Sequence, residues 1–479
     1  MSKRFKIRSI LFLFIFGILF YSCAVGPDFQ KPQVEIPKYF NYDSLATDSL
    51  VNLKWWEIFN DPVLDTLVIT ALNENKDVLI AISRIEEARA NLGFTKADIF
   101  PRIDLQGQAT RGNYLGGGTK LDSEVNGFFI APVVNWEIDF WGKFRRANES
   151  AKAQYLASEF SLRKIQISLI TEVVSTYFIL LDYRERLLVS ERTLDSRMES
   201  LRIIQERFNE GIVPEIDLNQ AQIQKEIAAA TVPLYKRLVA QTENSLSILL
   251  GRMPSSIKTG IDIDVRDVPP DIPVGLTSQL LERRPDISES LFLLQSQNAN
   301  VGVAVAQMFP SISLTGIFGL ASDDLSTLTN GNPAWSISGS LLGPIFNFGK
   351  NTSRVEIEEA RTEQTLYQYE NTVLNAFREV EDALVEVETF KEQLKSTERR
   401  YLAAKNAAML SQLRYDGGVT SYLEVLESDR TLFNAELQLS EFRQLTFNSF
   451  IKLYKALGGG WITKEEYVEA KKNQQMQSK

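Results

Sequence analysis

Along the chain, the spacing of hydrophobic residues changes from helical to alternating and back to helical, and it does so twice. Residues 133 to 140, VVNWEIDF, alternate between apolar side chains and the polar side chains of Asn135, Glu137 and Asp139. A two-residue period is typical of a strand, here with one apolar and one acidic face. Its partner strand is expected at about 102 to 114, across the turn-rich segment YLGGGTKLDSEVNG. The sequence therefore predicts a β-hairpin over 102–140.

The second pass of the pattern predicts another β-hairpin over 311–348. Its strands are expected in SISLTGIFGL, residues 311 to 320, and WSISGSLLGPIF, residues 335 to 346. The glycines at 116 to 118 in the first hairpin do not form a phosphate-binding loop, because such a loop starting at Gly112 needs lysine at 118 and the chain has glycine there. They are expected at a loop tip.

Each hairpin is followed by a very long helical stretch, at 143 to 210 and 350 to 416, without proline or an interior glycine before its last turn. At 1.5 Å per residue, each helix would be about 100 Å long. Apolar or aromatic residues recur every seven positions in both helices, which predicts a coiled-coil seam. The seams are Val173, Leu180, Leu187, Leu194, Leu201 and Phe208 in the first helix, and Val380, Val387, Leu394, Tyr401, Ala408 and Tyr415 in the second.

Tight turns, NEGIVPEID and DGGVTSYLE, lead from the long helices into returning helices at about 215 to 250 and 421 to 457. Pro214 suits a first helical position, and Ser421 with Glu424 has the pattern of a capping box. Each long helix and its returning partner are therefore expected to form a long helical hairpin.

The returning helices reach only about half as far as the long ones. Shorter helical stretches at about 62 to 98 and 285 to 308 are expected to stack end to end on them and complete the antiparallel partner.

The chain is an internal duplication. The matched residues include Asn91 with Asn300 and Phe100-Pro101 with Phe309-Pro310 at an offset of 209, and Gly142-Lys143 with Gly349-Lys350 and Leu250-Gly251 with Leu457-Gly458 at an offset of 207. The predicted organisation is a signal segment at 1–22, an N-terminal arm at 23–61, repeats at 62–258 and 285–460 joined by a linker at 259–284, and a tail at 461–479.

The amino terminus has the features of a targeting signal. Four basic residues precede an apolar run from Ile10 to Phe20, and the small residue Ser22 precedes Cys23, the one cysteine in the chain. A bacterial lipoprotein signal has this shape and is cleaved before a cysteine that becomes acylated. The alternative is an ordinary secretory signal with an incidental cysteine. We expect lipidation of Cys23.

Charge and composition exclude several classes of function. Without residues 1–22 the chain has 48 basic and 61 acidic side chains, a net charge of about −13, so nucleic acid is an unfavourable partner. The chain has no histidine, which excludes histidine general bases and imidazole metal ligands. The sequence predicts no enzyme activity, no cofactor and no metal site.

The predicted strands imply a membrane and more than one copy of the chain. No uninterrupted apolar run of about 18 residues follows Cys23, so no membrane-spanning helix is expected. Four strands with an apolar face cannot close a barrel, and open edges are not tolerated in a bilayer. An apolar outside, an acidic inside and the strand-end residues Trp136, Trp141 and Trp335 fit an outer-membrane barrel built from several copies.

Four sequence stretches carry a family resemblance: CAVGPDFQKP, LKWWEIFNDPVLDTLV, ERRPDI at 282 to 287 and VGVAVAQMFPSISLTG. They resemble the TolC-like outer-membrane efflux factors, in the lipoprotein (NodT-type) branch that works with resistance-nodulation-division pumps. The resemblance implies an α+β membrane protein. It also implies a homotrimer with a 12-stranded outer-membrane barrel, four strands per chain, continued by a long periplasmic α-helical coiled-coil barrel. Implied partners are a periplasmic adaptor protein, an inner-membrane transporter and outer-membrane lipid.

The resemblance also implies a passive conduit for small molecules, anchored by lipid in the outer membrane and extending into the periplasm. Its aperture and adaptor contact would be formed by the helix tips. An aspartate often found near the second tip is replaced here by Thr420, which leaves Asp416 as the nearest acidic residue. The expected tip residues are Gly211, Ile212, Val213, Pro214, Asp416, Gly417, Gly418, Val419, Thr420 and Ser421, and the expected barrel-lumen residues are Asn135, Glu137 and Asp139.

Two other classes remain open from the sequence. An outlet of a type I protein secretion system would use the same duct for a protein cargo. A purely structural periplasmic coiled coil would lack the alternating strands that this chain has.

Overall fold

The computed structural model describes residues 24–37, 40, 55–114, 120–266, 268–269, 277–330 and 333–459. The predicted signal segment, Cys23, the glycines at 116–118 and the tail at 461–479 lie outside these residues. The chain divides into two compact units. The first contains Met1–Gln33, Arg84–Glu159 and Glu289–Asn371, and the second contains Val34–Ser83, Phe160–Ser288 and Thr372–Lys479.

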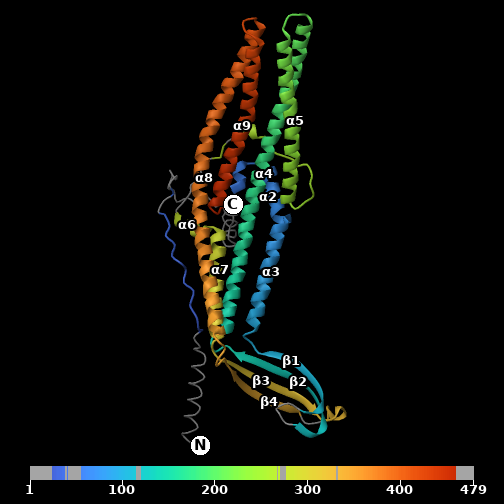
Figure 1. The fold of residues 1–479 in the computed structure, drawn as a ribbon, viewed down its shortest axis with the longest axis vertical. Coiled ribbons are helices and arrows are strands. Elements are labelled where there is room, and N and C mark those ends of the chain that lie inside the picture. The colour runs from blue at the N-terminus through green and yellow to red at the C-terminus, as the bar shows by residue number, and fades with distance from the viewer. Residues whose placement is uncertain are drawn as a thin grey trace, which may run out of the picture. The chain divides into compact units, whose positions relative to one another are not determined.

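The first unit contains a four-stranded antiparallel sheet in the order β1-β2-β3-β4 (Figure 1). The strands are β1 (Arg102–Tyr114), β2 (Lys120–Ile138), β3 (Ser311–Ser322) and β4 (Ala334–Leu342). The two predicted hairpins are confirmed and they pair with each other, because β2 pairs with β3 from Phe128↔Ser322 to Ile138↔Ile312. In the sheet that the structure describes, β1 and β4 are the edges.

Three strand boundaries were predicted wrongly. Residues 120–127, expected in a turn, extend β2, because Lys120 and Val125 to Gly127 pair with β1 and lengthen the hairpin. At their other ends, β2 stops at Ile138 and β4 at Leu342, before the predicted ends at 140 and 346. In both places the chain leaves the sheet to begin a helix.

The long helices and their returning partners are confirmed as α4 (Lys143–Asn209), α5 (Glu215–Leu249), α8 (Lys350–Asp416) and α9 (Tyr422–Ala456). Every predicted seam residue in α4 and α8 is buried or half-buried. In the second unit, ion pairs link neighbouring helices: Lys452 of α9 to Glu386 of α8 (2.7 Å), Arg192 of α4 to Glu436 of α9 (2.8 Å), and Lys236 of α5 to Glu191 of α4 (3.0 Å).

The stretch predicted as one helix at 62 to 98 is two helices, α2 (Pro62–Glu74) and α3 (Lys76–Ala97). The break is at Asn75, whose side-chain oxygen accepts hydrogen bonds from the amides of Asp77 (2.9 Å) and Val78 (3.3 Å) and so caps α3. The Asn75 amide group also donates to the carbonyl oxygen of Leu249, the last residue of α5 (2.9 Å). The predicted end-to-end stacking on the returning helix therefore holds for α3, whereas α2 packs in the core of the second unit.

The second repeat stacks in the same way. Its shorter helix is α7 (Pro285–Ala306), and Arg284, directly before it, donates to the carbonyl oxygen of Ala456 at the end of α9 (2.9 Å). The linker between the repeats contains two short helical elements, η2 (Ile263–Val265) and α6 (Thr277–Arg283).

The main hydrophobic core of the second unit forms where the shorter helices meet the long ones. It joins η1 (Trp55–Phe59), α2, α4, α5 and α9, and includes Val173, Tyr177, Phe178, Leu180 and Phe447. Phe178 and Phe447 stack at 4.6 Å between ring centroids, and Phe59 meets Phe178 edge-on at 4.9 Å. Aromatic contacts of this kind add to the hydrophobic stabilisation.

This core explains a difference from the sequence expectation. Among the described residues, α4 contains an 18-residue window that is long and apolar enough to cross a membrane, although no uninterrupted apolar run was found. The window is 67% buried inside the structure. Core packing therefore accounts for its apolarity.

Candidate functional site

The two helical-hairpin tips predicted to form the aperture have the same backbone geometry. In each, a glycine with a left-handed backbone ends the long helix: Gly211 has φ of 68° and Gly418 has φ of 68°. The amide of Ile212 donates to Arg207 O (2.8 Å), and the amide of Val419 donates to Arg414 O (2.9 Å). Both tips are therefore Schellman motifs, which need glycine because other residues are strained at positive φ.

The apolar residue that follows each tip glycine is exposed. Ile212 is 70% exposed and Val419 is 72% exposed. In Schellman motifs this residue often packs back onto the helix. Here both side chains instead remain available to another molecule.

Two cap predictions at the tips were wrong. Pro214 is the N-cap of α5, with ψ of 159°, and the helix begins at Glu215. Ser421 is the N-cap of α9, but its side chain makes no capping hydrogen bond, and the Glu424 carboxylate accepts a hydrogen bond from the hydroxyl group of Thr420. Arg414 Nε lies 3.4 Å from the same carboxylate. The side chain of Asp416 accepts a hydrogen bond from Gln412 (3.0 Å).

A small cluster of Arg207, Tyr415 and Tyr422 joins the two tips, and the sequence pattern did not predict it. Arg207, on the first hairpin, donates to the hydroxyl group of Tyr415 on the second (3.0 Å), and its guanidinium lies 5.3 Å from the centre of the Tyr415 ring. The Tyr415 and Tyr422 rings are 5.5 Å apart, and Tyr422 is buried beside Ile204 and Val425. Tyr415 had been marked by the heptad pattern, whereas the pattern gave no sign of Arg207.

The sheet has one almost wholly apolar face, and much of that face is exposed. The register places Ile103 opposite Val134, Trp136 opposite Leu314, and Phe318 opposite Trp335, so these residues share a face. The large exposed side chains on this face are Ile103, Leu105, Ile130, Val134, Leu314, Phe318, Trp335, Ile337 and Leu341. A continuous exposed apolar surface of this kind marks contact with a membrane or a partner.

The opposite face is mixed: besides small polar residues it carries Val133 and Ile317 and the charged residues Asp104 and Glu137, so the prediction of an acidic face was wrong. Along β3 and β4 it presents Ser313, Thr315, Ser336, Ser338 and Ser340. Of the predicted lumen residues, Asn135 and Glu137 are on this face, and Asn135 accepts a hydrogen bond from Thr315 (3.2 Å).

Asp139 lies beyond the end of β2 and has a different role. Its carboxylate accepts hydrogen bonds from the backbone amides of Phe144 (3.0 Å) and Arg145 (2.9 Å), at the start of α4. A carboxylate there satisfies unpaired amides and is favoured by the helix dipole. Glu137 pairs with Lys143 at 2.9 Å. Of the three predicted lumen residues, Glu137 and Asp139 therefore stabilise the connection between β2 and α4.

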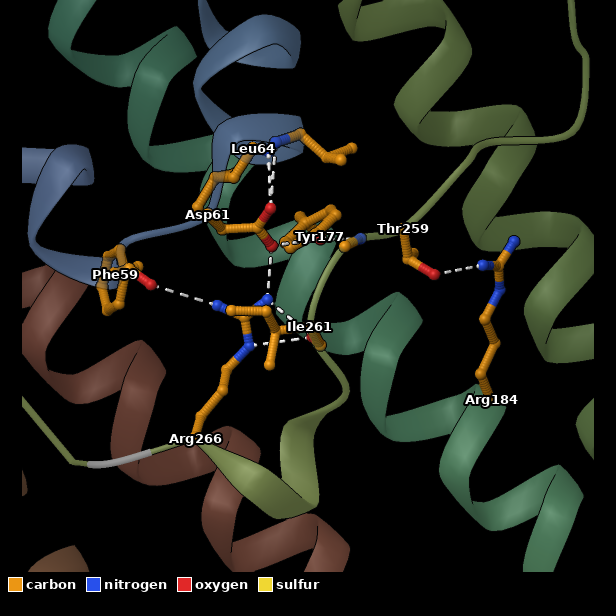
Figure 2. Close-up of polar contacts among 10 residues, drawn as sticks. Phe59, Asp61, Leu64, Tyr177, Arg184, Thr259, Ile261 and Arg266 are labelled. Atoms are coloured by element: carbon orange, nitrogen blue, oxygen red, sulfur yellow. Dashed lines mark hydrogen bonds and ion pairs between the residues drawn. The ribbon is translucent and has the colours of Figure 1, made fainter.

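The most buried polar cluster lies in the second unit, around Asp61 (Figure 2). Asp61 is completely buried, accepts a hydrogen bond from the hydroxyl group of Tyr177 (2.5 Å), and pairs with Arg266. The amide of Gly260 donates to the same hydroxyl group (2.9 Å), and a Cβ atom on Gly260 would lie 2.2 Å from the Asp61 carboxylate. Only glycine fits there.

This cluster fixes the segment that follows α5. Burial would by itself raise the pKa of Asp61, but the hydrogen bonds from Tyr177 and Arg266 outweigh burial and lower it. Burial and the bond to Asp61 raise the pKa of Tyr177. Arg184 holds the same segment through Thr259 (2.6 Å) and the carbonyl oxygen of Ile257 (2.6 Å). The side chains of Asp61, Tyr177 and Arg266 are buried and bonded to one another, so the cluster has a structural role.

Known proteins similar to this chain agree with these features. The family model described as "Outer membrane efflux protein" matches residues 67–252 and 276–459, two stretches that correspond to the two repeats. The solvent efflux pump outer membrane protein SrpC of Pseudomonas putida is 35% identical over 96% of this chain and 99% of its own length. The cation efflux system protein CusC of Escherichia coli K12 is 32% identical over 93% of this chain and 98% of its own length.

Solved structures give the same result. The Campylobacter jejuni CmeC outer membrane channel superimposes with a TM-score of 0.86 at 29% identity, over 94% of this chain and 98% of that one. The outer-membrane channel OprN superimposes with a TM-score of 0.86 at 29% identity, over 92% of this chain and 100% of that one. With its two-faced sheet and paired helical hairpins, this chain belongs to the outer membrane efflux protein family, a family of channel components of efflux pumps in the outer membrane.

Proposed function

We propose that this protein is the outer-membrane channel of a tripartite efflux pump, working as a homotrimer with a periplasmic adaptor and an inner-membrane resistance-nodulation-division transporter. Small molecules would cross it passively, and the transporter would supply the energy. The observation that carries this proposal is the exposed apolar face on a sheet with two edges, β1 and β4, that no strand in the described part of the chain covers. In a bilayer such edges must be paired.

Three copies suit this sheet better than two. Two copies would give eight strands, an interior that side chains fill, whereas three copies give twelve and leave an open lumen. The small polar residues of the opposite face, such as Ser313, Ser338 and Ser340, suit a water-filled lumen.

The helical hairpins carry unpaired seams that support the same assembly. On α5, Ile216 and Ile223 are seven residues apart and exposed, as are Ile227 and Leu234. On α8, the exposed residues Leu402, Met409 and Leu413 follow the same heptad spacing. Ion pairs link α8 to α9, α9 to α4 and α4 to α5, so these two seams lie on the outer helices of the set. We infer that α8 of one copy packs against α5 of the next and closes a ring.

The contact between α4 and α9 within the chain supports this pairing. At an offset of 207, α4 corresponds to α8 and α5 corresponds to α9. The chain already pairs α4 with α9, so pairing α8 with α5 between copies repeats the same kind of contact. The inferred contact therefore uses a geometry that the molecule already contains.

We also propose lipidation at Cys23. The neighbouring arm is held beside the end of β2: the amide of Val25 donates to Trp141 O (3.0 Å), and Arg146 pairs with Asp28 (2.7 Å). A lipid on Cys23, two residues before Val25, would therefore start near the end of the sheet's apolar face. Mass spectrometry of the mature amino terminus should find an acylated cysteine as the first residue, and an unmodified terminus elsewhere would contradict the proposal.

We propose that the tips, residues 209–214 and 416–421, form the periplasmic aperture and the adaptor contact. The exposed side chains of Ile212 and Val419 would meet the adaptor, and the Arg207–Tyr415 contact would hold neighbouring hairpins together when the aperture is closed. Asp416 would lie near its copies and make closure depend on ionic conditions.

Conductance in planar bilayers tests the channel and its aperture together. The purified protein should form pores of low conductance, and Tyr415→Phe, which removes the hydrogen bond from Arg207, should raise it. Val419→Asp should leave conductance nearly unchanged but reduce drug export when adaptor and transporter are present. A protein that forms no pores would contradict the channel proposal, and pores indifferent to both changes would contradict the location of the aperture.

A further inference from the structure

The duplicated chain contains two connections from a strand to a long helix, and one of them is covered while the other is not. We call residues 139–142, between β2 and α4, the first junction, and residues 343–349, between β4 and α8, the second junction. Both helices start with the same hydrogen bond, from Arg146 N to Gly142 O (2.8 Å) and from Ser353 N to Gly349 O (2.9 Å). The repeat offset of 207 places Phe348 at the position of Trp141.

The first junction is closed by contacts within the chain. The Trp141 ring stacks on Phe309 with 4.5 Å between centroids and 21° between planes. Its Nε1 donates to the carbonyl oxygen of Pro310 (2.9 Å), and its own carbonyl oxygen accepts from Val25 (3.0 Å). Trp141 is therefore held by the turn between α7 and β3 and by the N-terminal arm.

The second junction exposes its apolar residues instead. Ile345 is 101% exposed, Phe346 is 76% exposed and Phe348 is 91% exposed. Phe348 also has a φ of 53°, an unfavourable angle for a bulky residue. Such strain persists where surrounding contacts impose it. The described part of the chain supplies Phe348 with one ring contact, at 4.5 Å to Phe346, which is itself mostly exposed.

The surface that would cover the second junction is present elsewhere in the same unit. The offset of 209 pairs Phe309, the partner of Trp141, with Phe100, which is 60% exposed. It also pairs Gly302, which packs against Gly26 and Arg146, with Gly93, which has open space around it. Each part of the closed arrangement thus has an unoccupied counterpart on α3 and the turn after it.

The missing neighbour must be another molecule. Within the chain, α7 lies between α4 and α8, because Ser296 bonds to Ser150 of α4 (2.9 Å) and Gln297 bonds to Glu358 of α8 (2.6 Å). Its counterpart α3 contacts α4 through Arg89 and Tyr155 (3.5 Å). The side of α3 that should meet an α8 helix is open, and Ile357, the α8 counterpart of Ser150, is 50% exposed.

We propose that Phe348 of one copy stacks on Phe100 of the next copy, as Trp141 stacks on Phe309 within the chain, and that α8 of the first copy packs against α3 of the second. The contact is head to tail, so it repeats around a closed ring and leaves no copy uncovered. This inference rests on the proposed trimer and names the residues that join its copies where strands become helices. A copy of the same chain is the partner because the repeat already contains the matching surface.

Photo-crosslinking from the two equivalent positions tests the proposal with an internal control. The photoreactive residue p-benzoylphenylalanine is placed at Phe348 or at Trp141 in the full-length chain, expressed in outer membranes. After illumination, the Phe348 probe should link two chains, through a peptide containing residues 97–101. The Trp141 probe should link residues 307–310 of its own chain and leave the band of a monomer on a denaturing gel.

The possible results separate this inference from the trimer itself. Trimers seen on native gels with a Phe348 probe that links only to lipid would overturn the aromatic contact and leave the trimer standing. Absence of trimers in the unmodified protein would overturn the proposed assembly. A link from Phe348 to a peptide outside α3 and its turn would also overturn the contact.

A double-mutant cycle gives an independent measurement. Phe348→Ala and Phe100→Ala should each lower the temperature at which trimers dissociate by several degrees, and the double variant should lose little more than either single variant. Ile345→Ala is a control in the same junction without a stacking partner in the proposal. Losses from Phe348→Ala and Phe100→Ala that simply add would contradict direct stacking.

Discussion

The two repeats bond the ends of their returning helices through different side chains. In the first, Asn75 donates to the carbonyl oxygen of Leu249 at the end of α5 (2.9 Å). In the second, Arg284 donates to the carbonyl oxygen of Ala456 at the end of α9 (2.9 Å). An amide and a guanidinium thus do the same work, since either can donate to a helix end. By contrast, the backbone turns keep glycine in both copies, with φ of 81° and 84° at Gly142 and Gly349. Duplication has preserved what the backbone requires and varied the side chains that satisfy it.

The two repeats also differ in a polar cluster that the first repeat has and the second lacks. Tyr177, which joins Asp61 and Gly260 in the first repeat, corresponds to Leu384 in the second, and leucine has no hydroxyl group to bond. The segment after α5 is therefore locked to the first repeat by a polar cluster. The linker that joins the repeats therefore has a fixed path at its start.

Breaking the Asp61 cluster should give the largest effect. Arg266→Ala leaves the Asp61 carboxylate buried without its cation, which should cost about 3 to 5 kcal/mol of unfolding free energy. Urea unfolding of the purified protein, followed by circular dichroism, measures this. Arg202→Ala is the control, because Arg202 forms exposed pairs with Glu199 and Glu206 that should contribute less than about 1 kcal/mol. Equal losses in both variants would contradict the role of the cluster.

Removing the two helix-end donors compares the repeats directly. Arg284→Ala should cost about 2 to 3 kcal/mol, because the buried guanidinium also pairs with Asp286 and Glu379. Asn75→Ala should cost about 1 to 2 kcal/mol, through loss of one helix cap and one bond to α5. Unfolding in urea ranks the two variants, and a larger loss for Asn75→Ala than for Arg284→Ala would contradict the contribution of the Arg284 ion pairs.

Alanine substitutions at the two neighbouring tip glycines, Gly417 and Gly418, should differ in their cost to stability because the two backbone angles differ. Gly418→Ala places a Cβ atom at φ of 68° and should cost about 1 to 2 kcal/mol. Gly417 lies outside the left-handed region, so Gly417→Ala should change stability by less than about 0.5 kcal/mol. Thermal unfolding of the two variants measures the difference, and a larger loss at 417 would contradict the Schellman assignment.

The smallest effect is expected from the pH dependence of Asp429. Burial raises the pKa of this carboxyl group, although Arg197 opposes the shift. Its protonated form is favoured in the folded state, so its contribution is fully present below the ordinary value of about 4 and is lost as pH rises through the raised value. Asp429→Asn should therefore raise the melting temperature at pH 7.5 by about 1 to 2 °C.

At pH values below the ordinary carboxyl value, the Asp429→Asn variant and the unchanged protein should melt at the same temperature. An equal difference at both pH values would show that the effect does not come from titration. The control is Asp416→Asn, at an exposed position in the same hairpin.

By itself, the sequence determined the elements and their duplication. Heptad spacing in α4 and α8, alternation in β2 and β3, and the turn glycines Gly211 and Gly418 are local patterns, since helices, strands and left-handed turns each restrict residues near in sequence. The family followed from motifs in the same order along the chain. What local patterns do not contain is which partner a side chain finds across the fold.

The tertiary structure decided those partnerships. It turned Asp139 from a predicted lumen residue into a cap for α4, joined Arg207 to Tyr415 across two hairpins, and buried Asp61 with Tyr177 and Arg266. Each of these contacts joins side chains whose distance depends on how helices and strands pack, and packing is set by the whole chain at once. It also left Phe348 exposed where the repeat covers Trp141, because the matching surface of a single chain is used only once.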